Sequence, residues 1–239
     1  MSISKEEQKI LAANKAIDTL IEQKKIFSGM KIGLGTGSTA LPAVKRLSER
    51  IEDGSLKDIK AVATSFQTEN YCKELGIPVY TLNDRAIDGE LNLTIDGADE
   101  IDSANNLIKG GGAALLLEKI VAYNSKAYVI VADESKSVAD MGTKFPLPVE
   151  IIGAARRSIE KELGKMGARC VLREGVRKCG PVITDNGNQI LDCVWERPVN
   201  PSEMEDRIAK IAGVVESGFF TKIKPTAFIA HFDGSVEIR

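Results

Sequence analysis

The sequence predicts an α/β protein built on a parallel sheet, with a smaller α+β domain inserted before the last strands. Three observations support this fold class. Strand-like and helix-like runs alternate in the first part of the chain, the pattern changes after Met141, and a strand pair is expected over 226–239. Alternating strands and helices imply parallel pairing with right-handed crossovers. We therefore expect one domain of residues 1–141 plus 222–239 and a second of residues 142–221.

The first domain is expected to contain helices between most of its strands. Apolar residues at helical spacing predict helices over 5–27, 39–51 and 67–76. Pro42 is tolerated in a first helical turn, and Gly76 suits the end of a helix. Apolar runs predict the strands, which cover 30–35, 58–65, 77–82, 91–95 and 126–132.

The second domain shows mixed helix and strand patterning. We expect a helix over 153–167, a strand over 169–173 and a helix near 201–211. Asn186-Gly187 suits a tight hairpin turn, so a hairpin is predicted around 184–188.

Composition excludes several classes of protein. The 239 residues are 43% hydrophobic and 28% charged, as in a globular protein with a real core, and the formal net charge of −2 argues against a nucleic-acid binder. No apolar run approaches the roughly 20 residues of a membrane span, and the N-terminus does not resemble a signal peptide. We therefore expect a cytoplasmic protein. The chain has four cysteines, Cys72, Cys170, Cys179 and Cys193, and none of them forms a CxxC pair. This spacing predicts scattered reduced thiols rather than disulfides or a zinc site.

A glycine-rich turn, GLGTGSTA (33–40), lies between a predicted strand and helix. Glycines there let backbone N–H groups point at an anion, and Ser38 and Thr39 add hydroxyl donors, so we expect binding of a phosphate or a carbohydrate oxygen. A nicotinamide dinucleotide is a weaker alternative, because it needs an acid after the second strand, where this chain has Thr64-Ser65-Phe66. A purely structural turn is the third reading.

An acidic cluster, DGADE, follows the strand at 91–95. Asp96 and Asp99 are candidates for acid–base chemistry on hydroxyl groups; a Mg²⁺ or Ca²⁺ site and a solvated turn are the alternatives. The following IKGGGAA places Lys109 beside a glycine loop, which argues against a metal. His231 is the chain's one histidine and reads as a strand residue, so proton transfer must rest mostly on carboxylates and lysines.

Glu118 is an acid in an apolar helix, with Ala114, Val121 and Ala122 on its face. Partial desolvation of such an acid predicts a raised pKa, as a general acid or base near neutral pH requires. The alternative is a helical glutamate paired with Lys119. Further on, Lys136 follows the fifth strand and is either a surface lysine or a phosphate ligand. The carboxyl ends of parallel strands line one crevice, which favours the ligand.

These motifs, in this order and spacing, resemble ribose-5-phosphate isomerase, type A. The segments that carry the resemblance are GLGTGSTA, TSFQTE, LTIDGADEID, IKGGGAALLLEKIV, VADESK and KFPLPVE, with TDNGN and GVVESGFF as later markers. The family interconverts D-ribose 5-phosphate and D-ribulose 5-phosphate in the pentose phosphate pathway without a metal or organic cofactor. It has a Rossmann-like α/β domain with a smaller inserted α+β domain, and its members are usually dimers or tetramers.

The resemblance also implies residue roles. Glu118 matches the proton-transferring base, with Asp96, Asp99 and Lys109 as polar catalytic residues and Lys9 as an N-terminal phosphate-binding lysine. The substrate-binding set it implies is Thr36, Gly37, Ser38, Thr39, Asp96, Gly97, Ala98, Asp99, Lys109, Gly110, Gly111, Gly112, Lys136 and Lys9.

Two rival classes share this type of fold. A sugar-phosphate sensor would keep the phosphate ligands but would not need an acid in an apolar setting at position 118. A coenzyme A transferase would need an acyl-accepting glutamate and a larger nucleotide pocket, and DGADE has no role in that chemistry.

Overall fold

The computed structural model describes residues 2–239 and divides them into two compact units. The first unit contains residues 2–98, 117–136 and 225–239, and the second contains residues 99–116 and 137–224. The sequence predicted boundaries after residues 141 and 221; the structure has them after residues 136 and 224. It also assigns the segment 99–116 to the second unit, although this segment lies between two strands of the first.

The first unit is built on a seven-stranded sheet in the order β14-β13-β7-β4-β1-β2-β3. All its strand pairs are parallel except β13–β14, which is antiparallel. This confirms the predicted α/β class. The strands are β1 (Lys31–Leu34), β2 (Lys60–Ala63), β3 (Val79–Tyr80), β4 (Leu93–Asp96), β7 (Tyr128–Asp133), β13 (Thr226–Ala230) and β14 (Val236–Ile238).

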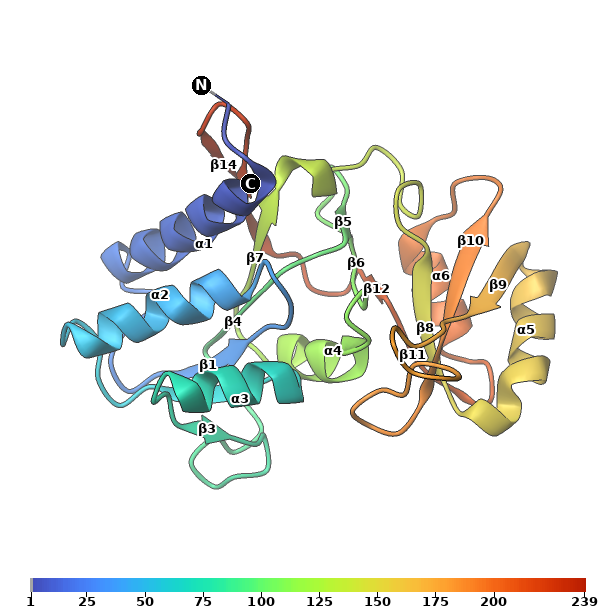
Figure 1. Cartoon of the computed structure of the whole chain (residues 1–239), viewed down its shortest axis with the longest axis horizontal. Helices are drawn as coiled ribbons and strands as arrows, with labels where there is room; N and C mark the ends of the chain where they lie inside the picture. Colours follow the sequence, from blue (N-terminus) through green and yellow to red (C-terminus); the bar gives the residue numbers. More distant parts are fainter. Residues whose placement is uncertain (1) are drawn as a thin grey trace. The chain divides into compact units, whose positions relative to one another are not determined.

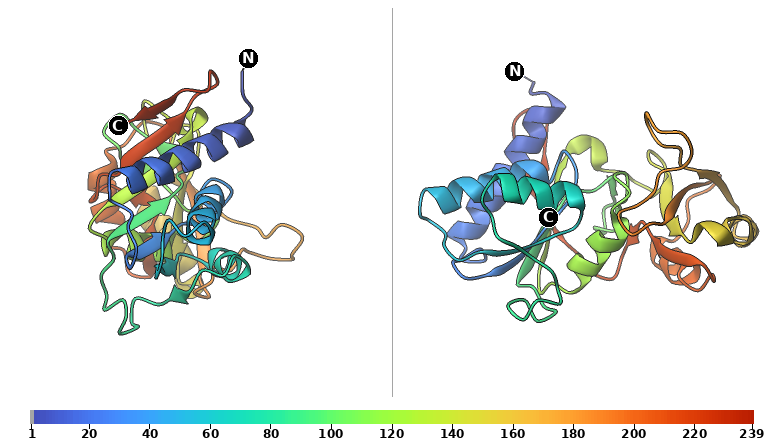
Figure 2. Two further views of the ribbon diagram at one scale, coloured as in Figure 1. Left: turned by 90° about the vertical axis from the view of Figure 1, so that its left-hand side faces the viewer. Right: turned by 60° about the horizontal axis from the view of Figure 1, so that its bottom comes forward.

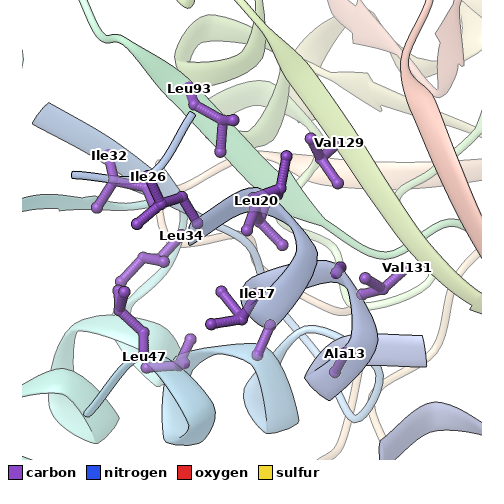
Figure 3. Packing of buried hydrophobic residues seen from close by; sticks show 14 of the residues in the cluster. Ala13, Ile17, Leu20, Ile26, Ile32, Leu34, Leu47, Leu93, Val129 and Val131 are labelled. Atoms are coloured by element: carbon purple, nitrogen blue, oxygen red, sulfur yellow. The ribbon is translucent and has the colours of Figure 1, made fainter. Parts of the chain in front are cut away.

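Helices cover both faces of this sheet (Figure 1). Successive strand residues point to opposite faces. Ile32 and Leu34 enter a core shared with α1 (Lys5–Glu22), α2 (Leu41–Glu52) and α3 (Phe66–Glu74), whereas Gly33 lies against Val121 of α4 (Leu115–Tyr123). Figure 3 shows the first core, where Ile17 and Leu20 of α1 lie among side chains from β1, β4 and β7.

Helix α1 begins at a capping box and ends earlier than the sequence predicts. The Ser4 side chain accepts a hydrogen bond from Glu7 N, and the Glu7 carboxylate accepts one from Ser4 N at 2.7 Å. The helix was predicted to reach residue 27 but ends at Glu22, because Lys24 adopts a positive φ of 56° and the chain turns back to bury Ile26. The segment before α1 lies beside the loop between β13 and β14, where Ile3 N donates to Phe232 O at 2.9 Å (Figure 2).

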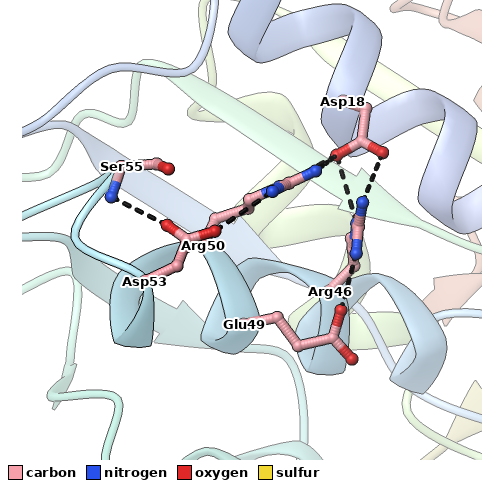
Figure 4. Close-up of polar contacts among 6 residues, drawn as sticks. All are labelled: Asp18, Arg46, Glu49, Arg50, Asp53 and Ser55. Carbon is pink, nitrogen blue, oxygen red and sulfur yellow. Dashed lines mark hydrogen bonds and ion pairs between the residues drawn. The ribbon is translucent and has the colours of Figure 1, made fainter.

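A network of charges joins α1 to α2 (Figure 4). Asp18 of α1 accepts hydrogen bonds from Arg46 and Arg50 of α2, with shortest distances of 2.7 and 2.9 Å. Burial alone would raise the pKa of Asp18, but the hydrogen bonds and charges of the two arginines outweigh it and lower that pKa.

The second unit holds two small antiparallel sheets. One has the order β11-β8-β10-β9 and the other β12-β6-β5. Apolar residues of the first sheet pack with α5 (Arg156–Lys165) and α6 (Pro201–Ile208) around buried side chains such as Leu147 and Ile159. The strands are β5 (Glu100–Ile101), β6 (Leu107–Ile108), β8 (Leu147–Ile151), β9 (Ala168–Leu172), β10 (Gln189–Trp195), β11 (Val214–Ser217) and β12 (Phe219–Phe220).

The predicted hairpin at 184–188 is present only as a turn. Thr184 N donates to Asn188 O at 2.9 Å, and Gly187 has a φ of 80°. β10 follows this turn and pairs with β9, so the hairpin strands are joined by the longer connection 173–188. The turn is held by Glu150, whose Oε1 accepts hydrogen bonds from the side chains of Thr184 and Asn188 at 2.9 Å each.

Candidate active site

The glycine turn after β1 holds the carboxylate of Asp96. Asp96 ends β4 and is fully buried, and its Oδ1 accepts hydrogen bonds from Gly97 N at 2.7 Å and Thr36 N at 3.3 Å. A Cβ atom on Gly35 would lie 2.6 Å from Asp96 Cα and closer still to the carboxylate. Position 35 therefore requires glycine because Asp96 occupies the space of a side chain. The sequence had assigned this turn to an external anion.

Hydrogen bonds between hydroxyl groups also stabilise the glycine turn after β1. Thr36 Oγ1 lies 2.7 Å from both Thr64 Oγ1 and Ser65 Oγ, and Thr68 Oγ1 donates to Gly35 O at 2.8 Å. The segment after β2, where a dinucleotide-binding protein needs an acid, thus supports Thr36 instead.

The predicted phosphate-binding residues of the first unit lie partly together. Lys9 Nζ donates to Ser38 Oγ at 3.1 Å and also contacts Glu6 at 2.6 Å. Thr39 is buried against Gly97. Lys136 ends a short 3₁₀ helix, Glu134–Lys136, whose first residue donates its N–H to Gln8 Oε1 at 3.4 Å. The 3₁₀ helix that ends at Lys136 therefore lies near the N-terminal end of α1, which also carries Lys9.

Glu118 lies on α4 and is only 4% exposed. The predicted apolar neighbours Ala114, Val121 and Ala122 are buried with it. Tyr128, at the start of β7, is a nearby residue that sequence reasoning missed. Burial raises the pKa of the Tyr128 hydroxyl well above its usual value, and the charges of Asp96 and Glu118 raise it further. The charges of both carboxylates therefore reach this buried hydroxyl.

In the second unit, another glycine turn holds Asp99. Gly111 N donates to Asp99 Oδ2 at 2.7 Å, and a Cβ atom on Gly111 would lie 2.6 Å from Asp99 Oδ1. Gly110 has a φ of 104°, which favours glycine, and Gly112 is exposed. Lys109 is buried, with its ammonium 5.8 Å from the centroid of the Phe220 ring, which is within cation–π range.

Glu100, the last acid of the DGADE cluster, has a structural role that differs from those proposed for Asp96 and Asp99. Glu100 is fully buried, and its carboxylate accepts backbone hydrogen bonds from Gly142, Lys144 and Phe145 at 2.5 to 2.7 Å. This glutamate holds the 142–145 loop and so belongs to the structure of the second unit. Within residues 2–239, no group of three or more His, Cys, Asp or Glu side chains could hold a metal ion.

The remaining candidates lie outside these groups. His231 follows β13 by one residue and contacts Glu134 at 3.1 Å and Glu237 at 3.4 Å. All four cysteines are free thiols, but Cys170 and Cys193 are directly opposite each other on β9 and β10, with their sulfurs 3.2 Å apart. Spacing in the sequence did not indicate this pair. No helix in the described part of the chain is long and apolar enough to cross a bilayer.

These features define a Rossmann-like α/β protein in which Asp96, Lys109 and Glu118 are buried. The chain belongs to the ribose 5-phosphate isomerase A (phosphoriboisomerase A) family, whose model matches residues 60–234. The resemblance inferred from the sequence is therefore confirmed.

Relatives match along nearly the whole chain. Ribose-5-phosphate isomerase A of Treponema denticola is 59% identical over 224 residues, covering 93% of this chain and 94% of that protein. The Treponema pallidum protein is 50% identical, covering 97% of this chain and 92% of its own length. A D-ribose-5-phosphate isomerase solved in complex with phospho-erythronic acid superposes with a TM-score of 0.92 at 39% identity, over 99% of both chains. The Methanocaldococcus jannaschii enzyme gives 0.89 at 40% identity, also over 99% of both.

Proposed function

We propose that this chain interconverts D-ribose 5-phosphate and D-ribulose 5-phosphate through an enediolate, as expected for its family. The observation that carries the proposal beyond the family match is the burial of two carboxylates, Asp96 at the end of β4 and Glu118 on α4. A sensor that only binds sugar phosphate has no need of such acids. The reaction moves one proton between C1 and C2 and a second between the two oxygens.

Glu118 is assigned the carbon-bound proton. It removes the proton from C2 of the open-chain aldose and returns it to C1 on the same face. Its burial on α4 supports this role, because a general base in a buried site is held in position and shielded from bulk water.

The two aspartates are assigned the hydroxyl chemistry. Asp99 moves the proton between O1 and O2, and Asp96 assists ring opening or holds substrate hydroxyls. Lys109 and the amides of Gly110 and Gly112 are assigned the enediolate oxygen, at about 3–4 kcal/mol per well-placed donor, because the Gly111 amide already donates to Asp99. The hydrogen bond from Gly111 N to Asp99 also fixes the direction of that carboxylate.

Ser38, Thr39, Lys9 and Lys136 are assigned the phosphate. The contact between Lys9 and Ser38 supports this assignment, because it joins a cation and a hydroxyl donor on two different elements. From the family resemblance we also propose that the protein acts in the cytoplasm as a homodimer or homotetramer. Sedimentation equilibrium measures the oligomeric state directly.

One assay tests the function. The protein is incubated with ribose 5-phosphate in the presence of EDTA, and ribulose 5-phosphate is measured. We expect ketose to form without added metal or organic cofactor, and much more slowly with Glu118→Gln. If the wild-type protein forms no ketose, with or without added divalent metal, the proposed function is wrong.

A further inference from the structure

Arg173 links the second unit's small sheet to its glycine turn. The residue follows β9, and its Nη1 donates to Gly110 O at 2.8 Å and to Gly111 O at 3.1 Å. The other side of the guanidinium faces Asp192 of β10, which accepts hydrogen bonds from Nε at 2.9 Å and Nη2 at 2.5 Å. Both side chains are mostly buried, at 15% and 23% exposure.

This arrangement uses the rigid, planar fork of arginine. Two donors form a bidentate pair with a carboxylate, and a third is held at a fixed angle to them. Arg173 is itself anchored, because its backbone N donates to Ile190 O at 2.9 Å. The guanidinium is therefore fixed before it meets the turn.

By holding the carbonyl of Gly110, Arg173 also sets the direction of the Gly111 N–H in the same peptide group. In a trans peptide the C=O and the following N–H point in opposite directions. The peptide bonds of residues 2–239 are all trans, so holding Gly110 O at Arg173 directs Gly111 N away from it, toward Asp99 Oδ2 at 2.7 Å. Glycine peptides rotate with little steric resistance, so this plane needs an external restraint.

We propose that Arg173 and Asp192 are positioning residues for catalysis. They fix the 110–112 turn and, through the Gly110–Gly111 peptide, the carboxylate of Asp99. The inference rests on the proposed role of Asp99 in moving the hydroxyl proton. Neither residue needs to contact substrate; their effect is on the orientation of groups that do.

The test compares Arg173→Gln, Arg173→Lys and Asp192→Asn with a matched control, Arg156→Gln. Arg156 is also paired with a carboxylate in the second unit, Glu160 at 2.7 Å, but lies on α5. With ribose 5-phosphate as substrate we expect kcat of Arg173→Gln to fall by roughly 10- to 100-fold, since a misplacement of about 1 Å costs up to 10²-fold. KM should change less than about threefold. Lysine keeps the charge but not the fork, so it should restore little.

Two further measurements separate positioning from simple stabilisation. Affinity for phospho-erythronic acid, whose planar carboxylate stands in for the two enediolate oxygens, should fall with kcat. In an Asp99→Asn background, Arg173→Gln should add less than about threefold, because both changes then remove the same function. A purely structural role would lower the melting temperature and leave kcat per folded molecule unchanged.

The outcomes are distinct. The proposal is overturned if Arg173→Gln keeps more than half of wild-type kcat, or if its effect multiplies fully with that of Asp99→Asn. If Arg173→Gln does not fold, Asp192→Asn, which keeps the guanidinium but weakens its anchor, decides the matter by the same kcat and double-mutant criteria. Failure of the proposed function would appear separately, as absence of ketose with the wild-type protein.

Discussion

Gly35→Ala tests whether the first glycine turn exists to admit Asp96. The added Cβ would lie 2.6 Å from Asp96 Cα, whereas such atoms essentially never come within 3.0 Å of a neighbour. The difference, 3.0 less 2.6 Å, requires the backbone to shift by at least 0.4 Å, and the carboxylate, which would be closer still, must move further. A shift approaching 1 Å in a catalytic group costs on the order of 10²-fold in rate. We therefore expect kcat to fall by roughly that factor.

The measurement is kcat for ribose 5-phosphate, together with the melting temperature of each variant. Gly164→Ala is the matched control: a Cβ there meets nothing within 4 Å, and the position lies inside α5. That change should be neutral or stabilising by about 0.5–1 kcal/mol. If Gly35→Ala is as stable as wild type and keeps more than a third of its kcat, the steric reasoning about Asp96 is refuted.

Other changes test the remaining assignments. Glu118→Gln keeps shape but removes the proton acceptor, so turnover should fall about 10²–10⁴-fold with binding of phospho-erythronic acid nearly intact; more than a third of wild-type turnover would contradict the role. Lys136→Ala and Lys9→Ala should weaken ribose 5-phosphate more than unphosphorylated ribose, and an equal effect on both would exclude phosphate binding. In heavy water, unlabelled substrate should gain deuterium at C1 at low conversion, seen by mass spectrometry; complete absence of incorporation together with full retention of a C2 label would indicate hydride transfer instead.

Asp18→Asn gives a prediction about stability and pH. The pKa of Asp18 is lowered in the folded state, so its ion pairs stabilise the protein above the unfolded pKa of about 3.9 and lose that effect as pH falls through the lower folded value. The variant should be about 1 kcal/mol less stable than wild type at pH 7 and approach it near pH 3. Urea unfolding at the two pH values measures this, and an equal loss at both would show that the charge is not responsible.

The sequence predicted those parts of the fold and the candidate site that depend on local pattern. Alternating strands and helices indicated the parallel sheet, and the residues around Glu118 indicated its burial, because helical periodicity places neighbours on one face. The end of α1 was missed, since the turn at Lys24 depends on where Ile26 is buried. The acidic cluster could not be separated into Asp96, Asp99 and Glu100 by spacing, because their surroundings come from distant parts of the chain.

Long-range contacts account for what the sequence left undetermined. Arg173 is 62 and 63 residues from the two glycines it holds, and the antiparallel register of β9 and β10 places Asp192 beside it. Tyr128 reads as an ordinary strand residue until β7 pairs with β4. Neither position carries a local signal, since each acquires its role only when separate segments pair.

Each of the two aspartates lies against a glycine turn of its own unit. Asp96 accepts hydrogen bonds from Gly97 N at 2.7 Å and Thr36 N at 3.3 Å, and Asp99 accepts one from Gly111 N at 2.7 Å. A side chain on Gly35 or Gly111 would occupy the space of the respective carboxylate. Water could hydrogen-bond these carboxylates equally well, but it would have to reorganise as charge moves during the reaction. Fixed backbone dipoles do not, and such preorganised donors lower the barrier without a reorganisation cost. In the proposed mechanism, the glycines of both turns therefore contribute by leaving room for a carboxylate beside the backbone. Replacing either with alanine should lower kcat, even though neither glycine is assigned a proton.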